Sequence, residues 1–146
     1  NGDIEVAEAT SGRPHSRLRA SGTPHPLALS NDGRYVAAFG NKEGLVLFDR
    51  RSGETSDRIE RRQLWSNSGA RVACLRFSAD GRLLLAGMDD GLVRVWSTRT
   101  GESLLVLETG DSRVAWLDLS SDGRFLATGG REDSVRIWNC LWPDEA

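Results

Sequence analysis

The chain is poor in the residues that build metal and redox sites. Its 146 residues include only two cysteines, Cys74 and Cys140, and two histidines, His15 and His25. These residues form no Cys-X-X-Cys, His-Glu-X-X-His or histidine-rich motif, so we expect no metal site, no thiol oxidoreductase and no cofactor. Two cysteines 66 residues apart are more typical of free thiols in a reducing compartment than of a disulfide framework, which indicates a cytoplasmic protein.

Long apolar runs and an excess of one charge are also missing. No apolar run approaches the roughly 18 residues that a membrane span needs, and no signal-peptide pattern stands at the start of the sequence. The 19 basic and 21 acidic residues give a formal net charge of −2, whereas a nucleic-acid-binding protein normally has a strong basic excess. We therefore expect neither a membrane nor a nucleic-acid partner.

Motifs that carry catalytic chemistry are absent as well. The chain contains no Gly-X-Ser-X-Gly, Gly-X4-Gly-Lys-Ser/Thr or Gly-X-Gly-X-X-Gly sequence. Asp89 and Asp90 form a pair of carboxylates, but they lie in a predicted turn between strands, where aspartate is favoured for conformational reasons. The sequence therefore predicts a protein that is not an enzyme.

What the chain does contain is an internal repeat. Asp-Gly-Arg occurs at residues 32–34, 80–82 and 122–124, at spacings of 48 and 42 residues. An aromatic residue stands sixteen positions after each of these aspartates, namely Phe48, Trp96 and Trp138. This constant spacing indicates one structural unit that is repeated along the chain.

Each unit has the pattern of short strands joined by turns. Segments 71–77 and 113–119 are rich in β-formers and end at an Asp-Gly turn, after which 82–87 and 124–129 form the returning strands. Residues 92–96 alternate apolar and basic side chains, as in a strand with one wetter face. No segment has a sustained 3.6-residue period. The sequence thus predicts an all-β chain with four antiparallel strands per unit of ~40–45 residues, which is typical of a β-propeller blade.

At residues 26–54, 72–102 and 114–139 the chain resembles the WD40 repeat family. The resemblance implies a WD40-type β-propeller and assigns eight structural repeat positions, namely Asp80, Gly81, Asp90, Trp96, Asp122, Gly123, Glu132 and Trp138. The family's Gly-His pair is replaced by Asn67-Ser68 and Thr109-Gly110. Met88 and Gly130 are assigned to the family's serine position. We therefore expect only part of the hydrogen-bond network that stiffens each blade in the family.

The resemblance also predicts the domain organisation. It implies one propeller segment, 1–146, made of a half blade (1–22), two blades (23–66 and 70–108) and a three-stranded last blade (112–140). Propellers have about four to eight blades, so thirteen strands form an incomplete ring. The remainder of the ring would come from an upstream part of the chain or from self-association, and the first of these fits the half blade better.

One segment departs from the repeat. The stretch between Glu54 and Arg71 is six residues longer than its counterpart in the next unit, and it contains Arg61, Arg62 and Trp65, of which Trp65 falls outside the repeat register. Arg and Trp are enriched at interaction hot spots, and the family's outer-to-inner loops open on the top face, where partners bind. These residues are candidate partner-binding residues. A solvated outer strand with the tryptophan folded against the sheet is the alternative interpretation.

The resemblance places further candidates on the same top face, namely Asn41, Asp89, Arg131, Arg71 and Arg113. It implies a non-catalytic scaffold that binds a protein or peptide partner there. The alternative is a sensor or regulatory propeller attached to an upstream kinase, NTPase or protease domain of a bacterial signalling protein, and an effector motif upstream would discriminate the two.

Overall fold

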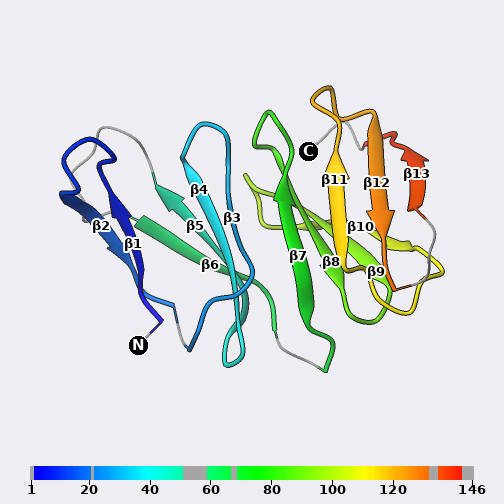
Figure 1. The fold of residues 1–146 in the computed structure, drawn as a ribbon, viewed down its shortest axis with the longest axis horizontal. Coiled ribbons are helices and arrows are strands. Elements are labelled where there is room, and N and C mark those ends of the chain that lie inside the picture. Colours follow the sequence, from blue (N-terminus) through cyan, green and yellow to red (C-terminus); the bar gives the residue numbers. More distant parts are fainter. Residues whose placement is uncertain (1, 21, 51–58, 67–68, 132–134, 143–146) are drawn as a thin grey trace.

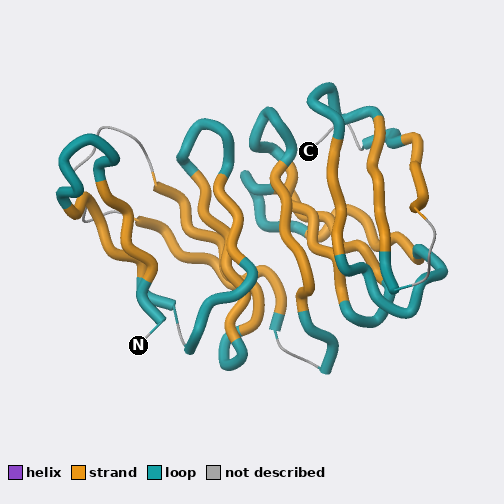
Figure 2. Tube along the Cα trace, viewed as in Figure 1, coloured by secondary structure: helices purple, strands orange, loops and turns teal. Residues whose placement is uncertain are grey.

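The computed structural model describes residues 2–20, 22–50, 59–66, 69–131 and 135–142. These ranges contain thirteen strands and no helix, and hence no helix that could cross a membrane (Figure 2). The strands are β1 (Ile4–Ala7), β2 (Pro14–Leu18), β3 (Leu27–Leu29), β4 (Tyr35–Gly40), β5 (Gly44–Arg50), β6 (Ile59–Trp65), β7 (Val72–Phe77), β8 (Leu83–Met88), β9 (Leu92–Ser97), β10 (Ser103–Glu108), β11 (Trp116–Leu119), β12 (Phe125–Gly129) and β13 (Val135–Asn139).

These strands form four antiparallel sheets. Strands β1 and β2 form a two-stranded sheet, β3 to β6 and β7 to β10 form two four-stranded sheets, and β11 to β13 form a three-stranded sheet. The sheets stand side by side in chain order, with the first strands β3, β7 and β11 adjacent to one another (Figure 1). The described sheets do not close into a ring. The predicted fold class, an all-β incomplete propeller, is confirmed.

The repeated Asp-Gly-Arg motif builds the turn between the first two strands of each of the three units. In the second unit the Ser78 hydroxyl donates to Oδ1 of Asp80 (2.6 Å), and the same oxygen accepts the Arg82 amide (3.0 Å). Gly81 has a φ of 73°, a left-handed conformation that glycine adopts at little cost. The serine and aspartate pairs Ser30–Asp32 and Ser120–Asp122 repeat these contacts. This shared local chemistry explains why the three units fold alike.

Apolar side chains pack between the sheets rather than inside any one of them. The core between the two four-stranded sheets contains Phe39 and Leu84, and it buries Trp96 to 2% exposure. A second core joins β7–β10 to β11–β13 and includes the fully buried Leu85 and Val114. Neighbouring sheets therefore stabilise one another, as expected for repeat units that cannot bury an apolar face alone.

The hydrogen bond of the last tryptophan corrects one expectation. The Trp138 indole donates to the hydroxyl of Thr128 (3.0 Å), two residues before Gly130, which had been assigned to the serine position. In the second unit the equivalent of Thr128 is Ala86, which has no hydroxyl, and Met88 is a fully buried core residue. The network is therefore partial, but its hydroxyl comes from a different position. Glu132, Asn67 and Ser68 lie outside the described residues.

The six surplus residues also lie elsewhere than predicted. Phe48 pairs with Arg61, thirteen residues further along, whereas the equivalent Trp96 pairs with Ser103, seven residues further along. The whole surplus therefore falls in the connection between β5 and β6. It does not lengthen the loop from the outer strand β6 to the inner strand β7.

Candidate partner-binding face

Several of the predicted site residues gather at one end of the sheets. This end, where β3, β7 and β11 begin and the β4–β5 and β8–β9 turns lie, is called the strand-start face. It lies along the lower edge of Figure 1. Arg71 and Arg113 precede β7 and β11, while Asn41 and Asp89 lie in the two turns. Because the strands are antiparallel, starts of first strands and these turns meet at the same edge.

Arg71 is held by its neighbours on both sides. Its amide donates to Oδ1 of Asp89 (2.8 Å), and the Asp89 amide donates back to the Arg71 carbonyl (2.9 Å). Its guanidinium donates to Oδ1 of Asn41 in the preceding sheet (2.8 Å). Arg71 thereby links two neighbouring sheets at the strand-start face.

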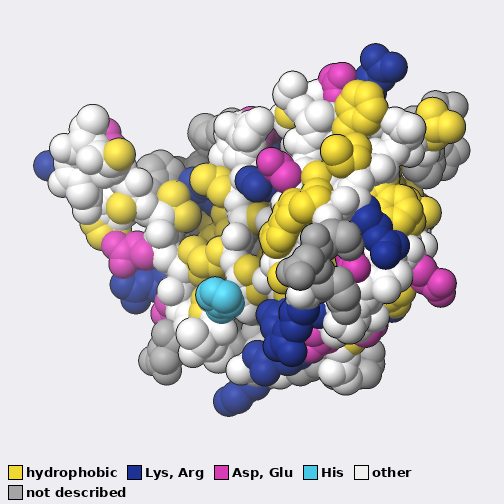
Figure 3. Space-filling view, turned by 45° about the vertical axis from the view of Figure 1, so that its right-hand side comes forward, with side chains coloured by type: hydrophobic (Ala, Val, Ile, Leu, Met, Phe, Trp, Pro, Cys, Tyr) yellow, Lys and Arg dark blue, Asp and Glu magenta, His cyan; other side chains and the backbone are white. Residues whose placement is uncertain are grey.

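A cavity of about 270 Å³ opens on this face. It is lined by His25, Arg71, Val72, Ala73, Asp89 and Arg113. Figure 3 shows basic side chains gathered beside a histidine in the lower part of the molecule. Three of the eight predicted candidates, Arg71, Asp89 and Arg113, thus meet around one hollow. The cavity contains two guanidinium groups and one carboxylate.

Arg113 differs from Arg71 in how its charge is compensated. Its Nε atom is buried, and none of the described residues accepts a hydrogen bond from it. By the repeat spacing, Arg131 is the third-unit equivalent of Asp89, just as Arg113 is the equivalent of Arg71. The third unit therefore has two arginines where the second unit has an arginine and an aspartate. Arg131 itself is exposed on the β12–β13 turn, outside the lining of the cavity.

The other three predicted residues lie on the outer strand β6 and not in a loop. Arg61 forms an ion pair with Glu43, and Arg62 donates to the carbonyl of Arg99 in the next sheet (3.2 Å). Trp65 is partly buried beneath the guanidinium of Arg94, which lies 5.8 Å from its ring centroid. None of the three lines the cavity, and all three have contacts within the chain. Their placement fits the alternative interpretation, an outer strand with its tryptophan against the sheet.

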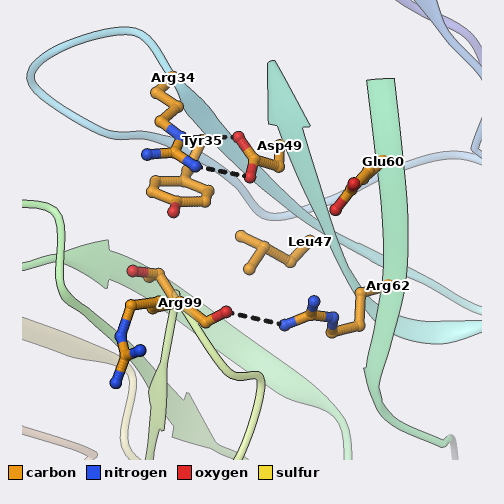
Figure 4. Close-up of a pocket in the computed structure, with 8 residues that line it drawn as sticks. Arg34, Tyr35, Leu47, Asp49, Glu60, Arg62 and Arg99 are labelled. Carbon is orange, nitrogen blue, oxygen red and sulfur yellow. Dashed lines mark hydrogen bonds and ion pairs between the residues drawn. The ribbon is translucent and has the colours of Figure 1, made fainter. Parts of the chain in front are cut away.

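A second cavity lies between the two four-stranded sheets and contains Arg62 (Figure 4). It has a volume of about 160 Å³ and is lined by Arg34, Tyr35, Leu47, Asp49, Glu60, Arg62, Thr98 and Arg99. Arg34 donates to both carboxylate oxygens of Asp49 (2.7 and 2.9 Å), and these hydrogen bonds raise the pKa of its guanidinium. The arginines whose bonds are drawn in Figure 4 therefore already have acceptors.

The described part of the chain offers no candidate metal centre. It contains no group of three or more His, Cys, Asp and Glu side chains that could hold a metal ion. Both cysteines are free, and burial raises the pKa of the Cys74 thiol to about 11, so this thiol is not activated as a nucleophile. Asp90, paired with Asp89 in the sequence, accepts the amide of Leu92 (3.1 Å) as a turn residue.

Comparison with known families decides the identity of the fold. The family model described as "WD domain, G-beta repeat" matches residues 61–97 and 101–139, slightly more than half of the chain. The chain belongs to the WD40 repeat family. Each matched WD40 repeat begins with an outer strand, β6 or β10, and continues through the first three strands of the next sheet. Trp65 therefore lies inside one of the two matched WD40 repeats.

Similar proteins are found in animals, plants and fungi. The serine-threonine kinase receptor-associated proteins of Bos taurus and Homo sapiens are 32% and 31% identical over 102 residues, which are 68% of this chain and 27% of theirs. Protein ROOT INITIATION DEFECTIVE 3 of Arabidopsis thaliana is 34% identical over 71 residues, which are 49% of this chain and 15% of that protein. The match thus covers about a quarter of the length of each receptor-associated protein and a smaller share of the length of the plant protein.

A solved structure extends the likeness to nearly the whole chain. The β-propeller domain of Cps50 (Swd1) from Myceliophteria thermophila superimposes with a TM-score of 0.78 at 16% sequence identity, covering 98% of this chain and 49% of that one. At this identity the likeness shows the propeller fold alone.

Three residues of the cavity were missed in the sequence. Val72 and Ala73 follow Arg71 directly, so the repeat alignment could have included them as walls of any site built on Arg71. His25 belongs to no motif in the sequence. Its position is two residues after the first-unit equivalent of Arg71, which is the signal that could have placed it on the strand-start face.

Proposed function

We propose that this WD40 chain is part of a non-catalytic scaffold that binds a protein or peptide partner on the strand-start face. One observation carries the proposal: Arg71, Asp89 and Arg113, chosen from the sequence as partner-binding residues, line one cavity there. Arginines around a hollow that small apolar side chains also line offer both charge and contact area to a partner.

The relatives support a role in association. WD40 propellers generally bind other proteins, and the printed name of the bovine and human relatives describes a receptor-associated protein. Neither of the two cavities presented above combines a nucleophile, a base and metal ligands in a way that would favour an enzyme.

We also propose that the remainder of the ring is supplied by other strands, from an upstream segment or from further copies. Support comes from the outward face of β11–β13, where Trp116, Phe125, Val135 and Ile137 are 42–73% exposed. Apolar side chains of this size on one sheet face are typical of an interface.

An affinity capture with matched variants tests the scaffold role. The immobilised chain is compared with the double variants Arg71→Ala/Arg113→Ala and Arg82→Ala/Arg124→Ala, since Arg82 and Arg124 are exposed at the opposite end of the same sheets. We expect a protein whose recovery falls at least ~10-fold with the first variant and is unchanged with the second, because charged hydrogen bonds at an interface are lost only in the first. Equal recovery of every bound protein by all three chains would remove the proposal.

A further inference from the structure

We propose that the cavity on the strand-start face receives an anionic oxygen group of the partner peptide, a carboxylate or a phosphate, and that Arg113 is its principal ligand. This inference rests on the proposed function and names the chemistry of the same site. The proposed ligand is one anionic group on a peptide partner.

The charges around the cavity favour an anion. Two guanidinium groups, from Arg71 and Arg113, face one carboxylate, from Asp89. That carboxylate is already engaged, because its Oδ1 accepts the Arg71 amide at 2.8 Å. The two arginines and the aspartate that line the hollow therefore leave one positive charge in excess.

Among the side chains that line the cavity, Arg113 has unused hydrogen-bonding capacity. A buried donor without an acceptor is costly, and Nε of Arg113 is such a donor among the described residues. Arg71, in contrast, gives a guanidinium hydrogen bond to Asn41 (2.8 Å). A carboxylate or phosphate has the planar or tetrahedral oxygens that accept two parallel hydrogen bonds from a guanidinium. An anion in the cavity would thus give an acceptor to a guanidinium whose Nε has none among the described residues.

The size of the cavity limits what enters it. About 270 Å³, with Val72 and Ala73 as small walls, accommodates one side chain that bears a charged group and excludes a folded segment. The cavity of Figure 4 differs in this respect, because Arg34 is bound by both oxygens of Asp49 and Arg62 by the Arg99 carbonyl. Arg34 and Arg62 thus have acceptors within the chain, whereas Nε of Arg113 has none among the described residues.

Labelled peptide pools test the inference directly. Four pools of fluorescein-labelled decapeptides have random flanks and a fixed central residue, which is glutamate, phosphoserine, glutamine or lysine. Their binding to the chain is measured by fluorescence anisotropy at low and physiological salt. We expect the glutamate or the phosphoserine pool to bind at least ~10-fold more tightly than the glutamine pool, as charge-assisted hydrogen bonds predict. Which of these two pools binds more tightly identifies the source of the anion.

Variants assign the effect to Arg113. Arg113→Gln is expected to remove the preference for the anionic pool, Arg113→Lys to retain part of it through charge alone, and Arg82→Gln to leave it unchanged. Thermal melting by circular dichroism verifies that each variant is folded, and Arg113→Lys serves if Arg113→Gln is not. Equal binding of the glutamine, glutamate and phosphoserine pools, or an anionic preference that survives in both Arg113 variants, would overturn the inference.

The two proposals fail in different ways. If capture depends on Arg71 and Arg113 but replacing acidic residues of the captured partner by amides changes nothing, the anion site is wrong and the scaffold role stands. If neither the capture nor the peptide pools respond to these arginines, both proposals fall.

Discussion

The repeated turn allows one hydrogen bond to be compared in a buried and an exposed setting within one chain. In the second unit the Ser78 hydroxyl donates to Asp80 (2.6 Å) and accepts the amide of Leu83 (3.0 Å). In the third unit Ser120 makes the same two contacts at 2.7 and 3.0 Å. Ser78 and Leu83 are 5% and 4% exposed, whereas Phe125, whose amide Ser120 accepts, is 43% exposed. Burial is therefore the main difference between the two sites.

We predict that Ser78→Ala lowers the free energy of unfolding by about 1–3 kcal/mol, because it leaves the buried Leu83 amide without its acceptor. Ser120→Ala is expected to cost less than about 1 kcal/mol, since water replaces the hydroxyl at an exposed amide. Urea unfolding of both variants at one pH measures the difference, with unchanged m-values as the sign of unchanged compactness. Equal losses in the two variants would refute the link between burial and cost.

Three further predictions concern single positions. A hydrogen bond from the Ser30 hydroxyl lowers the pKa of the Asp32 carboxyl below 3.8, so the carboxylate stabilises the folded chain above that pH and this stabilisation is lost as the pH falls through the pKa of the folded state. Asp32→Asn should therefore flatten the fall of the urea midpoint between pH 5 and pH 3. An unchanged fall would contradict this. Burial raises the pKa of the Cys74 thiol from 9.0 to about 11, so this thiol should react with iodoacetamide at pH 8 about 100-fold more slowly in the folded than in the unfolded chain. Site-resolved mass spectrometry measures the two rates, and similar rates would exclude the effect of burial. Gly91→Ala should destabilise the chain by more than the ~1–3 kcal/mol of backbone strain at its φ of 83°, because an added Cβ would also meet the Asp111 carbonyl. Gly33→Ala is the control, since Gly33 has a φ of 73° but open space around its Cβ position. Equal shifts of the melting temperature in the two variants would show that the close contact has no effect.

The sequence predicts the sheets well because their determinants are local. Asp80, Gly81 and the serine before them build a turn through contacts within five residues, and the same pattern recurs in each unit. The tryptophan spacing sets which strand positions face the core, so Trp96 is buried as its register requires. A constant period thus carries enough information to fix strand order and pairing.

The sequence predicts less of what depends on distances between units. Counting residues revealed a surplus between Glu54 and Arg71 but not its position, and the pairing of Phe48 with Arg61 places it before β6. For the same reason the sequence predicts a loop at Arg61, which lies on strand β6 in the structure. The meeting of Arg71, Asp89 and Arg113 was predictable as a shared face, because Arg71 and Arg113 occupy equivalent repeat positions and the resemblance places Asp89 on the same face. The unmatched Nε of Arg113 was not, because it depends on side-chain packing.

The most direct test of the account is photocross-linking of a captured partner. A benzoylphenylalanine is introduced at Lys42, exposed on the β4–β5 turn of the strand-start face, or at Ser121, exposed on the β11–β12 turn at the opposite end. The account predicts a cross-linked partner from position 42, suppressed by Arg71→Ala/Arg113→Ala, and none from position 121. Cross-linking from position 121 alone, or equally from both, would contradict binding on the strand-start face.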